Sequence, residues 1–297
     1  MWAGLYWMAT IFSACSTGCL FPKERAFRSA DQLTQMKKSA PDKILAQTVL
    51  PFASYPIRPS GFVAALGPTV VVAPHPDDEA LGCGGLLALL HRAGQATAAV
   101  LVSDGSQSHP ASTRFPAPAR RAVREAEFRH ALALLGADAT EPLRCGLPDG
   151  RVPASASEPK FTETVARIRG FLERQRAATV LVPWRRDPHP DHRASNQLVR
   201  AALAEMPHPP RCLEYVVWAW ERAAPEDLPT VDDRVRGFRL NIKEVVVLKQ
   251  RAIAEHRSQV APGVFTDDAA GFLLSATMLA HFSGPYEVFF EDLNPST

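Results

Sequence analysis

The chain has 297 residues, of which 46% are hydrophobic and 22% charged, a balance typical of a soluble globular protein with a substantial core. Its formal net charge is only +2 at pH 7, and no long basic run is present, so the composition gives no reason to expect nucleic acid as a partner. We therefore expect a small-molecule ligand.

The first 21 residues, "MWAGLYWMATIFSACSTGCLF", are strongly apolar, but no Lys or Arg precedes them, which argues against a secretory signal. Two interpretations remain open. In the first, the segment anchors the chain in a membrane, and the basic residues after it place the main domain in the cytoplasm. In the second, the true start is Met36. Both predict a cytoplasmic protein, with membrane contact only through residues 1–22.

Five cysteines are scattered along the chain: Cys15, Cys19, Cys83, Cys145 and Cys212. An odd, widely spaced set is unlike a disulfide framework or a four-thiolate zinc site. We expect the last three to be reduced, buried thiols, because free Cys is among the most buried residue types.

Secondary-structure patterns divide the chain into a lead over residues 1–67, polar and extended in its later part, and one domain over 68–297. In this domain, apolar runs of strand length alternate with stretches of helical period. The first strands are apolar throughout, as in a parallel sheet covered on both faces. Strands are expected over 69–73, 96–103, 141–147 and 179–184, and helices over 81–94, 122–136, 163–176 and about 192–205.

The pattern changes after residue 206, where Pro-containing breaks separate the remaining elements. We expect strands over 211–220, 238–242 and 286–290 and a helix over 243–257. Trp218 and Trp220 alternate along the first of these strands and are expected to pack in the core or on the face of the sheet. The order of elements predicts an α/β fold, with a Rossmann-like, mostly parallel sheet, helices on both faces and a decorated C-terminal third.

Two polar motifs follow apolar strands directly: "PHPDDE" at 74–79 and "RRDPHPDH" at 185–192. In an open α/β sheet, the loops at the carboxyl ends of the strands face a common crevice where ligands bind. The two motifs are therefore expected to meet. The glycines of "LGCGGLL" after the first motif do not form a dinucleotide signature, and we expect Gly82, Gly84 and Gly85 to let the helix pack closely on the sheet.

The two motifs contain the ligands that zinc prefers. A catalytic Zn²⁺ commonly has three His or carboxylate ligands and keeps one position for water. His75, one of the adjacent residues Asp77 and Asp78, and His192 complete such a set. The side chains of consecutive aspartates diverge, so that one binds metal while the other takes the proton of the attacking water.

The second motif adds His189 and Asp191 to this set. An imidazole near the metal would stabilise the oxyanion or protonate the leaving nitrogen, and Asp191 would fix its tautomer and hold it charged. Singly, Asp78 and Glu79 are also good helix caps. The two His-Pro-Asp sequences together favour a metal-dependent hydrolase, either of an amide or of a phosphoester, over a non-catalytic sugar-binding module.

The chain resembles the PIG-L/LmbE-like zinc-dependent de-N-acetylases in "PHPDDE", "HPDH" and the shorter features "SDGSQSH", "LPDG" and "HRSQ", over roughly residues 68–290. The resemblance implies a Rossmann-like fold, one Zn²⁺ per chain, with Fe²⁺ as the alternative metal, and removal of an N-acetyl group from an amino-sugar conjugate of the N-acetylglucosamine type. Pro74 departs from the family, which usually has Ala there, and should stiffen the approach to His75.

Matching positions imply roles for single residues. The zinc ligands would be His75, Asp78 and His192. Asp77 would be the general base, and His189 the electrophile or acid, oriented by Asp191. Substrate contacts are assigned to three further residues: Asp104, Arg124 and Gln259. For Asp104 a turn-forming role is an equal alternative, for Arg124 the alternative is a solvated helix face, and Gln259 is assigned from the resemblance.

Overall fold

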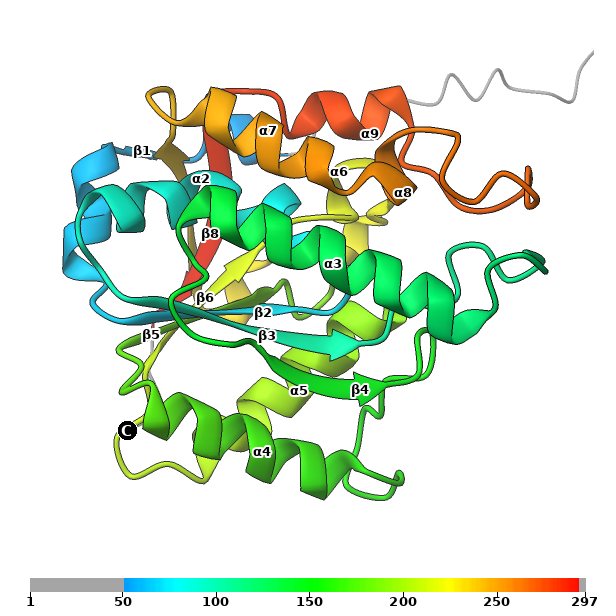
Figure 1. Ribbon diagram of the computed structural model, residues 1–297. Coiled ribbons are helices and arrows are strands. Elements are labelled where there is room, and N and C mark those ends of the chain that lie inside the picture. The colour runs from blue at the N-terminus through cyan, green and yellow to red at the C-terminus, as the bar shows by residue number, and fades with distance from the viewer. Residues whose placement is uncertain (1–50, 294–297) are drawn as a thin grey trace, which may run out of the picture. The chain divides into compact units, whose positions relative to one another are not determined.

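The computed structural model describes residues 51–293, which form an eight-stranded mixed sheet with helices on both faces (Figure 1). The strand order is β1-β7-β8-β6-β5-β2-β3-β4. The predicted α/β fold is thereby confirmed. The strands are β1 (Ile57–Arg58), β2 (Thr69–Ala73), β3 (Thr97–Ser103), β4 (Leu143–Leu147), β5 (Thr179–Pro183), β6 (Arg211–Tyr215), β7 (Val235–Asn241) and β8 (Tyr286–Asp292).

Five neighbouring strands, β6, β5, β2, β3 and β4, are parallel. Thr69 of β2 pairs with Thr97 of β3 on one side and with Thr179 of β5 on the other. The C-terminal third extends this sheet through β8, which lies antiparallel between β6 and β7. Because the five parallel strands point the same way, the loops after β2, β3, β4 and β5 share one edge of the sheet.

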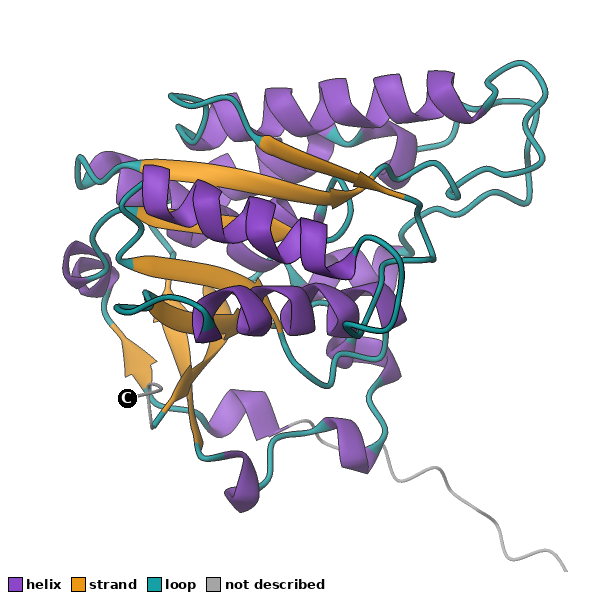
Figure 2. Cartoon of the chain, turned by 90° about the horizontal axis from the view of Figure 1, so that it is seen from below, coloured by secondary structure: helices purple, strands orange, loops and turns teal. Residues whose placement is uncertain are grey.

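Helices cover the sheet in two layers, with α2, α3 and α7 on one face and α4 and α5 on the other (Figure 1). Viewed from below, the strands run behind the helices of the second layer (Figure 2). The helices are α2 (Asp78–Arg92), α3 (Ala117–Leu135), α4 (Phe161–Arg174), α5 (Pro190–Ala204), α6 (Ala219–Arg222), α7 (Val246–Glu255), α8 (Arg257–Val260) and α9 (Ala276–His281).

The side chains of β2 belong alternately to two hydrophobic clusters, one on each face of the sheet. Val71 and Ala73 belong to the cluster packed under α2, α3 and α7, whereas Val70 and Val72 belong to the cluster formed with α4 and α5. All four side chains are at most 1% exposed. A strand buried on both faces explains why the run is apolar at every position rather than at alternate ones.

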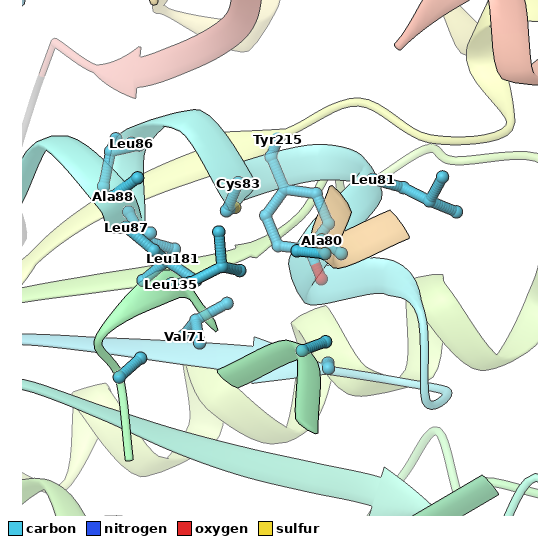
Figure 3. Packing of buried hydrophobic residues seen from close by; sticks show 14 of the residues in the cluster. Val71, Ala80, Leu81, Cys83, Leu86, Leu87, Ala88, Leu135, Leu181 and Tyr215 are labelled. Carbon is cyan, nitrogen blue, oxygen red and sulfur yellow. The ribbon is translucent and has the colours of Figure 1, made fainter. Parts of the chain in front are cut away.

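Close packing of α2 on the sheet depends on Gly82. The ring of Tyr215 lies against α2 beside Ala80 and Cys83 (Figure 3), and the Tyr215 hydroxyl donates to the Val72 carbonyl at 2.8 Å. A Cβ at position 82 would lie 2.2 Å from the Tyr215 ring, and one at Gly85 would lie 2.7 Å from Ile242. The predicted role of these two glycines in packing is confirmed.

We expect Gly82→Ala to destabilise the protein, because the new methyl group overlaps a buried ring that is held at both ends. Overpacking a tight core typically costs about 1–3 kcal/mol, which outweighs the gain in helix propensity of up to about 1 kcal/mol. Urea unfolding measures the change. The matched control is Gly170→Ala in α4, where the new Cβ meets only the end of the Arg174 side chain at 3.3 Å. An unchanged unfolding free energy for Gly82→Ala would contradict the packing argument.

The predicted strand over 211–220 is wrong beyond Tyr215, where β6 ends. The chain turns because the buried Asp187 carboxylate accepts the Trp218 backbone N–H at 3.0 Å, and α6 follows. Trp218 and Trp220 therefore do not lie on a strand.

The described part of the predicted extended lead is not extended throughout. It forms the short 3₁₀ helices η1 (Pro51–Ser54) and η2 (Ser60–Ala65) around β1, and Phe52 and Leu66 are each 1% exposed. The boundary between residues 67 and 68 stays a prediction.

The cysteine prediction is confirmed for Cys83, Cys145 and Cys212, which are free and buried. Cys15, Cys19 and the apolar segment 1–22 lie outside the described residues. Among residues 51–293, no helix is both long enough and apolar enough to cross a bilayer.

Candidate active site

The two motifs meet at the carboxyl edge of the parallel strands. "PHPDDE" connects β2 to α2, and "RRDPHPDH" connects β5 to α5. Both helices begin within their motif, at Asp78 and Pro190. A cavity of about 270 Å³ lies here, lined by residues of both motifs and of further segments between residues 81 and 274. The topology therefore brings together the side chains that the sequence singled out.

Asp78 lies close to each of the other two predicted zinc ligands. The Asp78 Oδ2 atom lies 3.4 Å from His75 Nδ1 and 3.2 Å from His192 Nε2. Ligands at about 2.0–2.1 Å from a tetrahedral zinc ion stand about 3.3 Å apart. His192 is fully buried, and neither of its ring nitrogens has a hydrogen-bond partner within residues 51–293. Buried polar atoms of this kind are rare, and this donor set fits a metal ion.

A second set of donors overlaps the first. One ring nitrogen from each of His75, His189 and His192 lies within 4.8 Å of the others. The ring centroid of His189 is 4.7 Å from that of His75 and 5.0 Å from that of His192. His75 and His192 are common to both sets, so the choice between Asp78 and His189 as the third ligand stays a prediction.

Asp77, the predicted general base, lies in the cavity wall and is 7% exposed. Its Oδ2 atom is 3.2 Å from Arg124 Nη2. Burial raises the pKa of its carboxyl to about 7; the Arg124 guanidinium opposes this shift and the negative charge of Asp78 adds to it. A carboxyl whose pKa lies near neutrality is well suited to take and return a proton.

The carboxylate of Asp191 binds His75. Its Oδ2 atom lies 3.1 Å from His75 Nε2, and it also accepts the backbone N–H groups of Gly150 and Val152. Because a ligating histidine is commonly held through its other ring nitrogen, this contact orients the Nδ1 atom of His75 toward the predicted metal position. The Asp191 carboxylate therefore positions His75, whereas the expected contact with His189 is made by the Asp191 backbone N–H.

His189 is held by the backbone of the same motif. Its Nδ1 atom accepts the backbone N–H of Asp191 at 3.2 Å, so the neutral ring carries its proton on Nε2. Burial and the neighbouring rings of His192 and His75 lower the pKa of His189 to about 4. The arrangement presents a neutral N–H donor rather than an imidazolium.

The three predicted substrate residues have different surroundings. Arg124 and Gln259 line the cavity, but the guanidinium of Arg124 also donates to the carbonyls of Gly105 and Pro76. The Arg124 side chain therefore links two loops by hydrogen bonds and is not solvated. Gln259 is fully buried, and its Oε1 atom has no hydrogen-bond partner within the described part of the chain.

Asp104 does not line the cavity in the described structure. Its carboxylate accepts the backbone N–H groups of Ser106 and Asp149, as expected for a residue that shapes a turn. Of the two roles considered for Asp104, the geometry supports the turn.

Three residues at the site were not predicted. Asp149 Oδ1 lies 3.3 Å from His75 Nε2, and Asp187 accepts the backbone N–H of His189 at 3.0 Å. Both are acidic residues in the loops after strands, within "LPDG" and "RRDPHPDH", and that position could have identified them. Trp218 lines the cavity, with its ring 6.2 Å from that of His189. It was missed because the apolar run around it predicts a strand.

Two loops, 104–116 and 262–274, form the outer wall of the cavity, to which they contribute Gln107, Ser108, Phe272 and Leu274. Their contacts hold them together. The Asp267 carboxylate accepts the backbone N–H groups of Thr113 and Arg114, both at 2.8 Å, and the Ser112 hydroxyl at 2.7 Å. The Pro- and Ser-rich loop after β3 is therefore fastened to the C-terminal third.

We expect Asp267→Ala to raise KM several-fold with little change in kcat, because it loosens the wall and leaves the two motifs intact. Steady-state kinetics on a cleaved substrate measures both constants. Asp138→Ala removes an exposed carboxylate in the turn after α3 and is the control. A fall in kcat at constant KM would show that the two loops act on the chemical step instead.

The fold and the site together define an α/β protein with a histidine–carboxylate donor set of the kind found in metal-dependent hydrolases. Residues 70–203 match the family model described as PIG-L, GlcNAc-PI de-N-acetylase. Over these residues the chain matches the PIG-L/LmbE-like de-N-acetylase family, as its motifs predicted. A search of curated proteins found no match.

Several solved structures share the fold. A conserved protein from Thermus thermophilus is 26% identical, with 77% of this chain and 96% of that chain covered and a TM-score of 0.51. N,N'-diacetylchitobiose deacetylase from Pyrococcus horikoshii is 18% identical, with coverages of 92% and 99% and a TM-score of 0.57. The 4-carboxy-2-hydroxymuconate hydratase from Pseudomonas putida is 17% identical, with coverages of 78% and 98% and a TM-score of 0.55. Since a deacetylase and a hydratase share it, the fold alone does not define the reaction.

Proposed function

We propose that the protein is a zinc-dependent hydrolase that removes the N-acetyl group from an amino-sugar conjugate of the N-acetylglucosamine type. The observation that carries the proposal is the position of Asp77, which lines the same cavity as His75 and Asp78, while His192 lies behind them, 3.2 Å from Asp78 Oδ2. The family model, named for a GlcNAc-PI de-N-acetylase, supports the amide bond as the target.

His75, Asp78 and His192 would hold the zinc ion. When bound, the ion would polarise the acetyl carbonyl and lower the pKa of water. Asp191 serves this set by accepting the Nε2 proton of His75, which keeps Nδ1 free as a ligand.

In the proposed reaction, Asp77 takes a proton from the water molecule as its oxygen attacks the carbonyl carbon. The Nε2–H group of His189 donates a hydrogen bond to the carbonyl oxygen as negative charge develops there. The carbon–nitrogen bond then breaks, and Asp77 returns its proton to the departing nitrogen. Acetate and a free amino sugar leave the site.

The lining of the cavity supports a sugar as the ligand. Apolar side chains form one part of the wall: Leu81, Val217, Trp218, Phe272 and Leu274. Polar groups stand among them, including the unpaired Gln259 Oε1 atom and the Ser108 hydroxyl, which also lacks a hydrogen-bond partner in residues 51–293. Fixed polar groups in a mostly apolar wall suit a ligand with hydroxyl groups around apolar ring faces.

Incubation of the metal-replete protein with a panel of N-acetylated amino sugars tests the proposal, with mass spectrometry to detect the loss of one acetyl unit. We expect acetate release from at least one N-acetylglucosamine conjugate. Binding of a sugar without cleavage would instead identify a sugar-binding module. Cleavage of a phosphoester but of no amide would be consistent with a metal-dependent hydrolase and would overturn the proposed substrate class.

A further inference from the structure

We infer that Glu79 and His256 form a positioning pair that holds the backbone of Asp77 in the conformation its proposed catalytic role requires. The inference rests on the proposed function for the role of Asp77. The contact between the two residues joins the start of α2 to the residue that follows α7, far away in the sequence.

The backbone of Asp77 is the first reason for the inference. Its φ is +146° and its ψ is −27°, a combination that L-residues rarely adopt. Such a conformation persists only where surrounding contacts determine it, and it is found mostly at functional sites. The contacts that hold Asp77 should therefore be unusually strong and specific.

Glu79 supplies one of these contacts. Its Oε2 atom accepts the Asp77 backbone N–H at 3.1 Å, and its Oε1 atom lies 2.7 Å from His256 Nε2. Both Glu79 and His256 are 0% exposed. Hydrogen bonds to an ionised group are shorter and stronger than neutral ones, and burial keeps water from replacing them.

Arg124 makes a second set of contacts with the Asp77 segment, independent of those of Glu79. Its guanidinium donates to the Pro76 carbonyl at 2.8 Å and lies 3.2 Å from the Asp77 carboxylate. Arg124 thus fixes the carboxylate and the peptide before it, whereas Glu79 fixes the backbone N–H. Removing Glu79 leaves the carboxylate of Asp77 in place but frees its backbone to rotate.

A purely structural role for Glu79, as a cap of α2, predicts a different result. A cap is local to its helix and does not need a histidine from another element. His256 is linked by hydrogen bonds to the Asp77 backbone through Glu79, and its charge also acts on the Asp77 carboxylate through space. Loss of either residue should therefore lower the rate of the chemical step to a similar extent, and the double variant should be no slower than the worse single variant.

The experiment measures kcat, KM, bound zinc and thermal unfolding for Glu79→Ala, His256→Ala, the double variant and Glu79→Gln. We expect a loss of about 10–100-fold in kcat for each alanine variant, at unchanged KM and zinc content, without additivity. Glu79→Gln should recover most of the rate, because its amide still accepts the Asp77 N–H and donates to His256.

The control is Glu127→Gln. Glu127 is also buried and binds the same segment, through the Ser258 N–H at 2.8 Å and hydroxyl at 2.6 Å, but it does not contact Asp77. Its kcat should stay within about twofold of the wild type. An undiminished kcat in Glu79→Ala, or a loss in proportion to bound zinc, would overturn the inference.

A crystal structure of Glu79→Ala supplies a readout that needs no substrate. We expect the φ of Asp77 to leave the region near +146° while Arg124 keeps its contact with Pro76. An unchanged φ would overturn the positioning role. If the wild type cleaves no N-acetylated sugar, the proposed function fails, whereas this structure still decides whether Glu79 controls the backbone of Asp77. Should Glu79→Ala fail to fold, the structure of His256→Ala answers the same question.

Discussion

His192→Ala is expected to lose bound zinc and catalytic activity together. The His192 ring is 0% exposed, with its Nε2 atom 3.2 Å from Asp78 Oδ2 and its Nδ1 atom 3.4 Å from Asp187 Oδ1. Its removal takes away one of the three proposed ligands and leaves a buried gap that a water molecule can fill. Because the metal supplies several kcal/mol of transition-state stabilisation, activity should fall at least about a thousandfold.

Elemental analysis of the purified variant measures zinc per chain, and the acetate-release assay measures activity. His130→Ala is the control, since His130 is an exposed histidine on α3, and it should keep both. His189→Ala separates the two overlapping donor sets. It should keep zinc and lose activity if Asp78 is the third ligand, whereas loss of zinc in His189→Ala together with its retention in Asp78→Ala would make the three histidines the donor set.

The centre of the fold could be predicted because its signals are local. The run 70–73 is apolar at every position, and acidic residues follow it at 77–79, so the local sequence predicts both the burial of β2 and where it ends. The same holds for β5. Parallel strands with their ends at one edge then bring the two motifs together whatever the details of the loops.

The contacts within the site could not be predicted in the same way, because they depend on a third segment. Asp191 is drawn to His75 by the backbone N–H groups of Gly150 and Val152, which bind the same carboxylate. Only the folded loop after β4 brings these donors to it. The sequence shows that His189 and Asp191 are neighbours. It does not show that the loop after β4 binds the Asp191 carboxylate and directs it to His75.

The end of β6 was missed for a related reason. The run over 213–220 is rich in aromatic and β-branched residues and has the composition of a strand. The Asp187 carboxylate ends the strand because it binds the Trp218 N–H, which is then not available for pairing in the sheet. Asp187 lies in the loop after β5. As a result, Trp218 lies beyond the strand, where it lines the cavity and still belongs to the hydrophobic core.

Asp77→Asn is expected to keep zinc and to lose about 10²–10⁴-fold in kcat, the usual contribution of a general base. The amide has nearly the shape of the carboxylate and can still accept from Arg124, but it cannot take a proton from water. The buried site contains no other free carboxylate at this position, because Asp78 faces His75 and His192 and Asp149 faces His75 within the described residues.

The measurement combines single-turnover acetate release with zinc analysis, so that chemistry is separated from product departure. Asp138→Asn, a change of the same kind at an exposed position, should match the wild type. If Asp77→Asn loses zinc, Asp77 belongs to the donor set and the roles of the adjacent aspartates are exchanged. If it keeps both zinc and the wild-type rate, the proton is taken elsewhere, and the position of Asp77 in the cavity no longer supports hydrolysis.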